Sequence, residues 1–174
     1  MKNEITNKVA KSGLVNIDLS DYAPKEEIVE LDIKRFLFEK VLLKEKVFRK
    51  TLSEFDFTKY QNKITGVYCS EEVIIPMWAY MLVSTHLNPY CTKIFFGNKE
   101  KALQQAILER LNEIDVTRLK DKKVIVNGCS NILLSEGLYI AISQKLQDNV
   151  QSLMFGEACS AVPIYKKRSL ESKQ

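Results

Sequence analysis

The sequence has few glycines and only one histidine. Its 174 residues include six glycines, and the single histidine is His86. Neither GxGxxG nor GxxxxGK[ST] occurs, so the loops that cradle nucleotide phosphates are missing and no nucleotide cofactor is expected. A Ser-His-Asp set is equally unsupported, because His86 has no obvious acidic partner. The sequence therefore carries no recognisable catalytic signature, and whether the protein is an enzyme stays open.

Long apolar runs are also missing. No window approaches the roughly 18 to 20 apolar residues that a membrane span requires, and the N-terminus has no apolar stretch of signal-peptide length. We therefore expect a cytoplasmic protein that does not contact a membrane. Lysine and arginine number 26 against 22 aspartates and glutamates, a net charge of +4. This excess is too small to indicate a nucleic-acid partner, and the oligomeric state is left undetermined.

Enough apolar residues are present for one folded core. Hydrophobic residues make up 45% of the chain, and domains of about 150 residues bury roughly 70% of the surface that the unfolded chain exposes. We expect a single α/β domain over residues 1–174. Residues 1–20 and 167–174 are polar and are expected to be flexible.

An internal repeat organises the second half of the sequence. Residues of about 63–97, "KITGVYCSEEVIIPMWAYMLVSTHLNPYCTKIFFG", resemble residues 122–156, "KKVIVNGCSNILLSEGLYIAISQKLQDNVQSLMFG". The offset is about 60, with one residue skipped after the cysteine. The aligned pairs include Cys69 with Cys129, Ser70 with Ser130, Tyr80 with Tyr139, Ser84 with Ser143 and Gly97 with Gly156. Each copy is interpreted as one folding unit.

Each copy has the pattern of a strand, a helix and a second strand. The first strands are predicted at 64–68 and 124–127, and the second at 93–96 and 152–155, because these runs are short, apolar and rich in β-branched or aromatic residues. The helix of the first copy has almost no polar face, which predicts deep burial. Two such βαβ units favour an α/β fold with a mainly parallel sheet covered by helices.

The remaining elements are predicted from shorter patterns. Apolar residues at helical spacing predict a covering helix over 99–114, between the two copies. In the first part, "EEIVELDI" and "KVLLK" read as strands, and 45–55 reads as a helix.

Three of the four cysteines stand in Cys-Ser pairs, at Cys69, Cys129 and Cys159. Loops that leave the carboxyl ends of parallel strands share one edge of a sheet, so we expect the three thiols to meet there. Thiolates bind zinc at about 2.3 Å, and the expected site holds zinc or iron. Candidate residues for a fourth ligand are Glu157 and Glu71, and Ser70, Ser130 and Ser160 are expected to line the site.

Other interpretations of the cysteines stay open. A free cysteine often serves as a small buried apolar side chain, and the zinc spacings CxxC and HxxH are missing. Cys91 is interpreted in this way. A metal-free thiol redox or transfer enzyme is one alternative to the metal site, and a non-catalytic interaction module is another.

Four sequence blocks resemble a bacterial family known as domain of unknown function 2480. They are "FLFEKVLLKEKVFRK", "YCSEEVIIPMWAYMLV", "VNGCS" and "SLMFGEACSAVPIYKK". The resemblance implies an accessory of iron–sulfur cluster assembly that has the assembly proteins as partners. In that role Cys69, Cys129 and Cys159 would hold iron, zinc, a cluster or transferred sulfur. The loop "NILLSEGL" departs from the family pattern, which puts a fourth ligand there in doubt.

Overall fold

The computed structural model describes residues 13–128 and 132–168. The chain divides into two compact units. Unit 2 is the continuous segment Pro24–Ala106, and unit 1 combines the segment before it with the segment from Ile107 onwards. Each unit has its own sheet, so each is described by itself.

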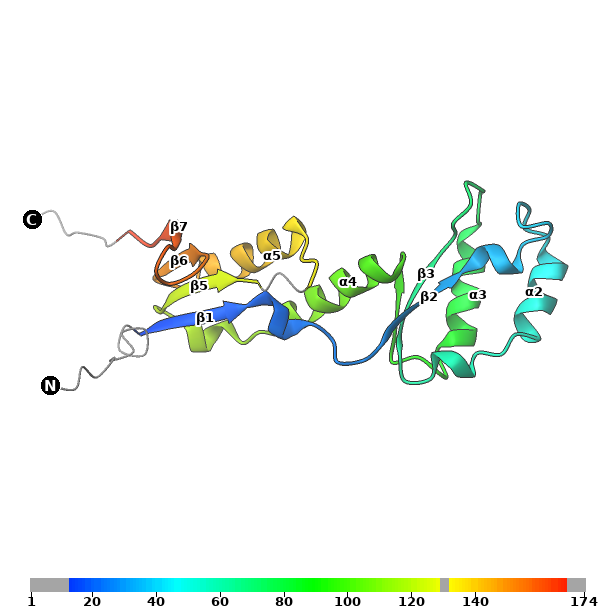
Figure 1. The fold of residues 1–174 in the computed structure, drawn as a ribbon, viewed down its shortest axis with the longest axis horizontal. Coiled ribbons are helices and arrows are strands. Elements are labelled where there is room, and N and C mark those ends of the chain that lie inside the picture. The colour runs from blue at the N-terminus through cyan, green and yellow to red at the C-terminus, as the bar shows by residue number, and fades with distance from the viewer. Residues whose placement is uncertain (1–12, 129–131, 169–174) are drawn as a thin grey trace, which may run out of the picture. The chain divides into compact units, whose positions relative to one another are not determined.

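Unit 2 is built on a parallel three-stranded sheet. Its strands β2 (Ile28–Asp32), β3 (Ile64–Tyr68) and β4 (Lys93–Phe96) pair in the order β2-β3-β4. Helix α2 (Glu45–Ser53) and helix α3 (Met77–Leu87) belong to this unit, and helix α4 (Lys99–Asn112) begins in it. Short 3-10 helices follow β2 (Ile33–Phe36) and precede β3 (Thr58–Tyr60). Figure 1 shows these elements along the ribbon.

The core of unit 2 forms where α2 meets α3. Phe48 and Leu52 lie one turn apart on α2 and are fully buried, and the Phe48 ring meets Trp78 of α3 edge-on at 5.8 Å. The helix expected over 45–55 is therefore confirmed. The strand expected in "KVLLK" is wrong, since this segment makes only an isolated bridge between Phe38 and Leu42. It ends at Lys44, directly before the first turn of α2.

Unit 1 has a four-stranded sheet with one reversed edge strand. Strands β1 (Leu14–Asp18), β5 (Lys123–Asn127) and β6 (Ser152–Phe155) are parallel, and β7 (Val162–Lys166) pairs antiparallel with β6. A 3-10 helix (Leu19–Tyr22) follows β1, a second one (Val116–Leu119) precedes β5, and helix α5 (Glu136–Gln147) connects β5 to β6. Strand β1 lies within residues 1–20, which were expected to be flexible. Pairing with β5 accounts for its order.

The expected α/β class with mainly parallel strands is confirmed, but the strands form two sheets instead of one. The physical reason lies in β1 and β2. Each pairs in parallel with a different later strand, β1 with β5 and β2 with β3, so each completes a separate sheet. The strand predicted in "EEIVELDI" is confirmed as β2, whereas β1 was not predicted, and no local pattern indicates which later strand either of them pairs with. The single domain over residues 1–174 stays a prediction.

The segments β3-α3-β4 and β5-α5-β6 share local contacts at a constant spacing of 59 residues. A glycine ends the last strand of each segment with a positive φ, and its amide bonds back to the neighbouring strand. A tyrosine of the helix meets a phenylalanine of that strand edge-on. The matching bonds run from Gly97 to Val67 (2.9 Å) and from Gly156 to Val126 (3.0 Å), and the ring pairs are Tyr80–Phe96 (5.6 Å) and Tyr139–Phe155 (5.7 Å).

Candidate functional site

A carboxylate fastens two loops at the carboxyl edge of the unit 2 sheet. Asp32 ends β2, and its side chain accepts hydrogen bonds from the amide of Lys34 at 3.0 Å and the amide of Ser70 at 3.1 Å. Burial would raise the pKa of Asp32, but the hydrogen bonds from Ser70 and the Lys34 amide outweigh it and lower that pKa. The ammonium of Lys34 also pairs with Glu71. These contacts hold the loop after β3 against the turn after β2.

Cys69 lies in this fastened loop. Its side chain is half-buried and packs against the apolar core of unit 2. The thiol lies near two titratable groups. The bond to Glu71 raises the pKa of Lys34, with a smaller contribution from the charge of Cys69, and burial followed by the charge of Cys69 raises the pKa of Tyr80. The ion pair between Lys34 and Glu71 thus holds the loop that contains Cys69.

The other cysteine predictions fall in unit 1. Cys159 and Ser160 are exposed in the connection between β6 and β7. Glu157 accepts a hydrogen bond from the side-chain amide of Asn127 at 3.3 Å, and its carbonyl accepts one from the amide of Ser160 at 2.9 Å. Cys129 and Ser130 lie outside the described residues.

Convergence of the three cysteines at one sheet edge requires a single sheet, and the described strands form two. Cys69 follows β3 in the unit 2 sheet, whereas Cys159 follows β6 in the unit 1 sheet. Within residues 13–128 and 132–168, no group of three His, Cys, Asp or Glu side chains is placed to hold a metal ion. The described residues therefore give the three-thiolate site no support, and it stays a prediction, as does the binding of zinc or iron.

The alignment of Cys69 with Cys129 is also shifted by one position. Cys69 directly follows the last residue of β3, and the residue that directly follows β5 is Gly128. A Cβ atom on Gly128 would lie 2.6 Å from the hydroxyl oxygen of Tyr139 and 2.3 Å from a methyl carbon of Leu134. The tyrosine that stands near the thiol in unit 2 thus stands against a bare glycine in unit 1.

An apolar groove lies on unit 2. It lies between α3, β4 and the segment before α3, and its volume is about 780 Å³. Four of its large apolar side chains are strongly exposed: Ile74 (94%), Met77 (75%), Met81 (69%) and Phe96 (62%). The unit 2 groove is lined by Val67, Val73, Ile74, Ile75, Met77, Tyr80, Met81, Ser84, Ile94, Phe95 and Phe96.

The groove corrects the expectation that α3 is deeply buried. Only Ala79, Val83 and Leu87 of this helix are buried, and Met77 and Met81 face outward. The missing polar face was interpreted as burial on all sides. It reflects instead an apolar side that none of the described residues covers.

Unit 1 has a corresponding groove, in which Ile140, Phe155 and Ile164 are likewise exposed. Its volume is about 420 Å³, and Ile164 of β7 is one of its lining residues. At the constant spacing of 59 residues, Met77 and Met81 correspond to Glu136 and Ile140. The unit 1 groove is lined by Val126, Glu136, Tyr139, Ile140, Ser143, Leu153, Met154, Phe155 and Ile164.

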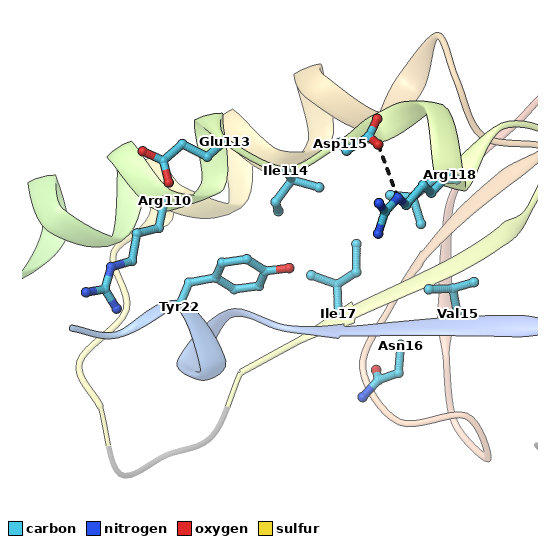
Figure 2. Close-up of a pocket in the computed structure, with 10 residues that line it drawn as sticks. Val15, Asn16, Ile17, Tyr22, Arg110, Glu113, Ile114, Asp115 and Arg118 are labelled. Carbon is cyan, nitrogen blue, oxygen red and sulfur yellow. Dashed lines mark ion pairs between the residues drawn. The ribbon is translucent and has the colours of Figure 1, made fainter. Parts of the chain in front are cut away.

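A third cavity, of about 570 Å³, lies in unit 1 between β1, the end of α4 and the 3-10 helix before β5. Figure 2 shows Tyr22, Ile17 and Ile114 facing this space. Its charged groups are engaged within the unit: Asp115 pairs with Arg118 at 3.2 Å, and Arg110 donates to the carbonyl of Ala23 at 2.8 Å. Asp115, Arg118 and Arg110 at the rim of this cavity therefore already have interaction partners within the protein.

Sequence reasoning missed the groove and the fastening carboxylate. Asp32 had a signal, because "IDLSDY" and "LDIKRF" both place an aspartate at a strand end, where each caps a 3-10 helix. The groove had a weaker signal in the purely apolar surface of α3 combined with Phe96 at the end of a short strand.

Comparisons with known proteins place the chain in a family without adding an activity. None of the described helices is long and apolar enough to span a membrane. The comparisons with curated proteins and with solved structures gave no match. A family model described as protein of unknown function (DUF2480) matches residues 3–167. This match extends over nearly the whole sequence, and the chain belongs to that family.

Proposed function

We propose that this protein is a non-catalytic binding module that takes up an apolar segment of a partner protein in the unit 2 groove. The observation that carries this proposal is the exposure of Ile74, Met77, Met81 and Phe96 around one groove. A contiguous apolar surface of this kind is costly to hydrate and is typical of interaction sites. Burying it against apolar side chains would recover roughly 25 cal/mol for each Å² removed from water.

The polar contacts at the sheet edge support this function by shaping the groove. Asp32 and Lys34 hold Ser70 and Glu71, and the chain then continues directly into Val73 and the rest of the groove wall. The fastening thus limits the freedom of one wall before any partner binds, which lowers the ordering cost of binding. In this interpretation Cys69 packs under the loop.

A protein partner fits the accessory role that the family resemblance implies. Iron–sulfur assembly proteins are the proposed partners, and the groove offers them a docking surface that needs no metal ligand. The proposal therefore does not depend on the three cysteines, and their replacement by serine should leave partner binding intact.

The experiment measures binding of a labelled peptide to the full chain by fluorescence anisotropy. The probe is SAVPIYKKR, residues 160–168 of this sequence, because it contains β7, whose Ile164 lines the corresponding groove in unit 1. We expect Met81→Glu to weaken binding by about tenfold or more, since a charge in the groove must be desolvated. The matched control is Ile140→Glu, the corresponding exposed position of α5, which should change binding by less than about twofold.

Two results would contradict the proposal. One is no binding of the probe to the wild-type chain at any accessible concentration. The other is equal binding of a scrambled peptide of the same composition with no effect of Met81→Glu. Circular dichroism checks that both variants fold, which is expected because both side chains are exposed on helix surfaces.

A further inference from the structure

The groove of unit 2 borders an open sheet edge. Strand β4 is the last strand in the order β2-β3-β4, and no strand among the described residues pairs with its other side. An edge strand presents backbone N–H and C=O groups that can accept another strand, although the Phe96 carbonyl of β4 already accepts a hydrogen bond from the side-chain amide of Gln105 at 3.5 Å, which an added strand would have to replace. Phe96, which is exposed at the end of β4, belongs both to this edge and to the groove.

Unit 1 shows what occupies the corresponding edge. There β6 takes the place of β4, and β7 pairs with it antiparallel, in the register that places Leu153 opposite Tyr165. Ile164 of this strand lines the unit 1 groove. The pairing extends past the strand end through a bond from the amide of Lys167 to the carbonyl of Gln151 at 2.9 Å.

The two grooves have several lining residues in common, but only the unit 1 groove is lined by a residue of an added strand. Tyr80, Ser84 and Phe96 of the unit 2 groove have Tyr139, Ser143 and Phe155 at the same places in unit 1. Val67 and Val126 also correspond, as the equivalent bonds from Gly97 and Gly156 show. The unit 2 groove is the larger of the two, and no counterpart of β7 lines it among the described residues.

The rim of the unit 2 groove is also less polar. Glu136 at the start of α5 places a carboxylate on the unit 1 groove, whereas the corresponding residue in unit 2 is Met77, which is strongly exposed. The ion pair that follows β7 in unit 1 also has no equivalent acidic residue in unit 2. Lys167 pairs with Asp121 at 3.2 Å in unit 1, and the residue at the place of Asp121 in unit 2 is the neutral Asn62. An occupant of the unit 2 groove therefore needs apolar contacts more than a basic end.

We propose that the partner binds unit 2 as an extended strand that pairs antiparallel with the open edge of β4 and places a β-branched apolar side chain in the groove. This inference rests on the proposed function and names the mode of recognition. The occupant is a segment of another protein that, like β7, is a short apolar strand containing a β-branched residue. Main-chain bonds to β4 supply part of the affinity, and the groove selects the side chain, as in other cases of strand addition.

The test uses two N-methylated forms of the SAVPIYKKR probe with the full-length protein. One form is methylated at the amides of residues 165 and 167, and the other at those of residues 164 and 166. Successive amides of a strand point to opposite sides, so one set must face β4 and the other must face away. We expect one form to lose at least tenfold in affinity and the other to bind within about threefold of the unmodified probe.

The outcomes separate the two proposals. If both methylated forms bind like the unmodified probe and Met81→Glu still abolishes binding, strand pairing is overturned and the apolar groove stands. If no form binds, both proposals fail. If the wild-type chain forms a dimer that Met81→Glu converts to a monomer, as measured by light scattering, the occupant is a second copy of this chain and the assignment to another protein is overturned.

Discussion

At the scale of single residues, Asp32 connects two segments of unit 2 through its side chain. It caps the 3-10 helix after β2 and also accepts the Ser70 amide, so one carboxylate joins segments that are 38 residues apart. Loss of a capping carboxylate costs about 1 kcal/mol in many proteins. The loop held by Asp32 leads into the groove, and the strength of this contact therefore affects both stability and binding.

The first residue-scale prediction concerns pH. The pKa of Asp32 is lowered in the folded state, so the unfolded chain takes up a proton first as the pH falls. The stabilisation is present above the unfolded pKa, about 3.9, and is lost as the pH falls through the lower folded value. Urea unfolding between pH 5 and pH 3 should show a smaller loss of stability in Asp32→Asn than in wild type. Parallel pH profiles of the two proteins would contradict this assignment.

At the scale of elements, the backbone of β3 packs directly against the backbone of the turn before α4, with no room for a side chain between them. A Cβ atom on Gly66 would lie 2.5 Å from the carbonyl oxygen of Gly97 and 2.9 Å from that of Asn98. These atoms belong to the turn that leads into α4, whose first amide, that of Lys99, donates to Glu30 of β2 at 3.0 Å. The turn thus packs against Gly66 of β3 and is bonded to Glu30 of β2, so it cannot easily shift to make room for a larger side chain.

The element-scale prediction compares two glycine substitutions. Gly66→Ala should destabilise unit 2 by about 1 to 3 kcal/mol, because the added methyl group overpacks a fixed turn. Gly137→Ala in α5 is the matched control, since its Cβ meets only the Ser135 hydroxyl at 3.7 Å. It should stabilise the protein by roughly 0.5 to 1 kcal/mol. Urea unfolding followed by the fluorescence of Trp78, the single tryptophan, measures the first change, and circular dichroism measures both.

Elements were easier to predict from this sequence than their arrangement. The strands over 93–96 and 152–155 have the predicted limits, because each is a short apolar run that ends at a glycine. The covering helix expected over 99–114 ends at Asn112. Strand β1 was missed because five residues next to a polar terminus give no periodic signal. The division into two sheets depends on long-range pairing of β1 and β2, which local patterns do not encode.

The candidate site was predicted less well for a related reason. Cys91 behaves as expected, since it packs at the core and contacts Thr65 at 3.1 Å, while the corresponding pair in unit 1 is Val150 and Val124. The cysteines after the strands were grouped by a rule for one sheet, and the chain has two. The sequence of an apolar helix face does not show whether that face is buried in the protein or exposed on its surface. Met77 and Met81 required coordinates for that distinction.

At the scale of the whole molecule, the segments β3-α3-β4 and β5-α5-β6 share local contacts and differ in the element that follows the last strand. After β6 the chain turns back and adds β7, which pairs with β6 and contributes Ile164 to the lining of the unit 1 groove. After β4 it continues directly into α4, and no strand of the described residues returns to that edge. The chain therefore has one groove beside a paired sheet edge and one beside an edge with which no strand of the described residues pairs.

The whole-molecule prediction is that removing β7 creates a second binding site. A chain that ends at Ala161 lacks Ile164 and leaves β6 as an edge, so unit 1 then resembles unit 2. Titration calorimetry with the SAVPIYKKR probe should give a stoichiometry near two for this chain and near one for a control that ends at Arg168. The second site should be weaker, because Glu136 replaces the exposed Met77. Adding Met81→Glu to the shortened chain should remove the unit 2 site and return the stoichiometry to one. A shortened chain that still binds one peptide, and loses it with Met81→Glu, would show that the equivalent walls of the two grooves are insufficient and that recognition requires the purely apolar rim of unit 2.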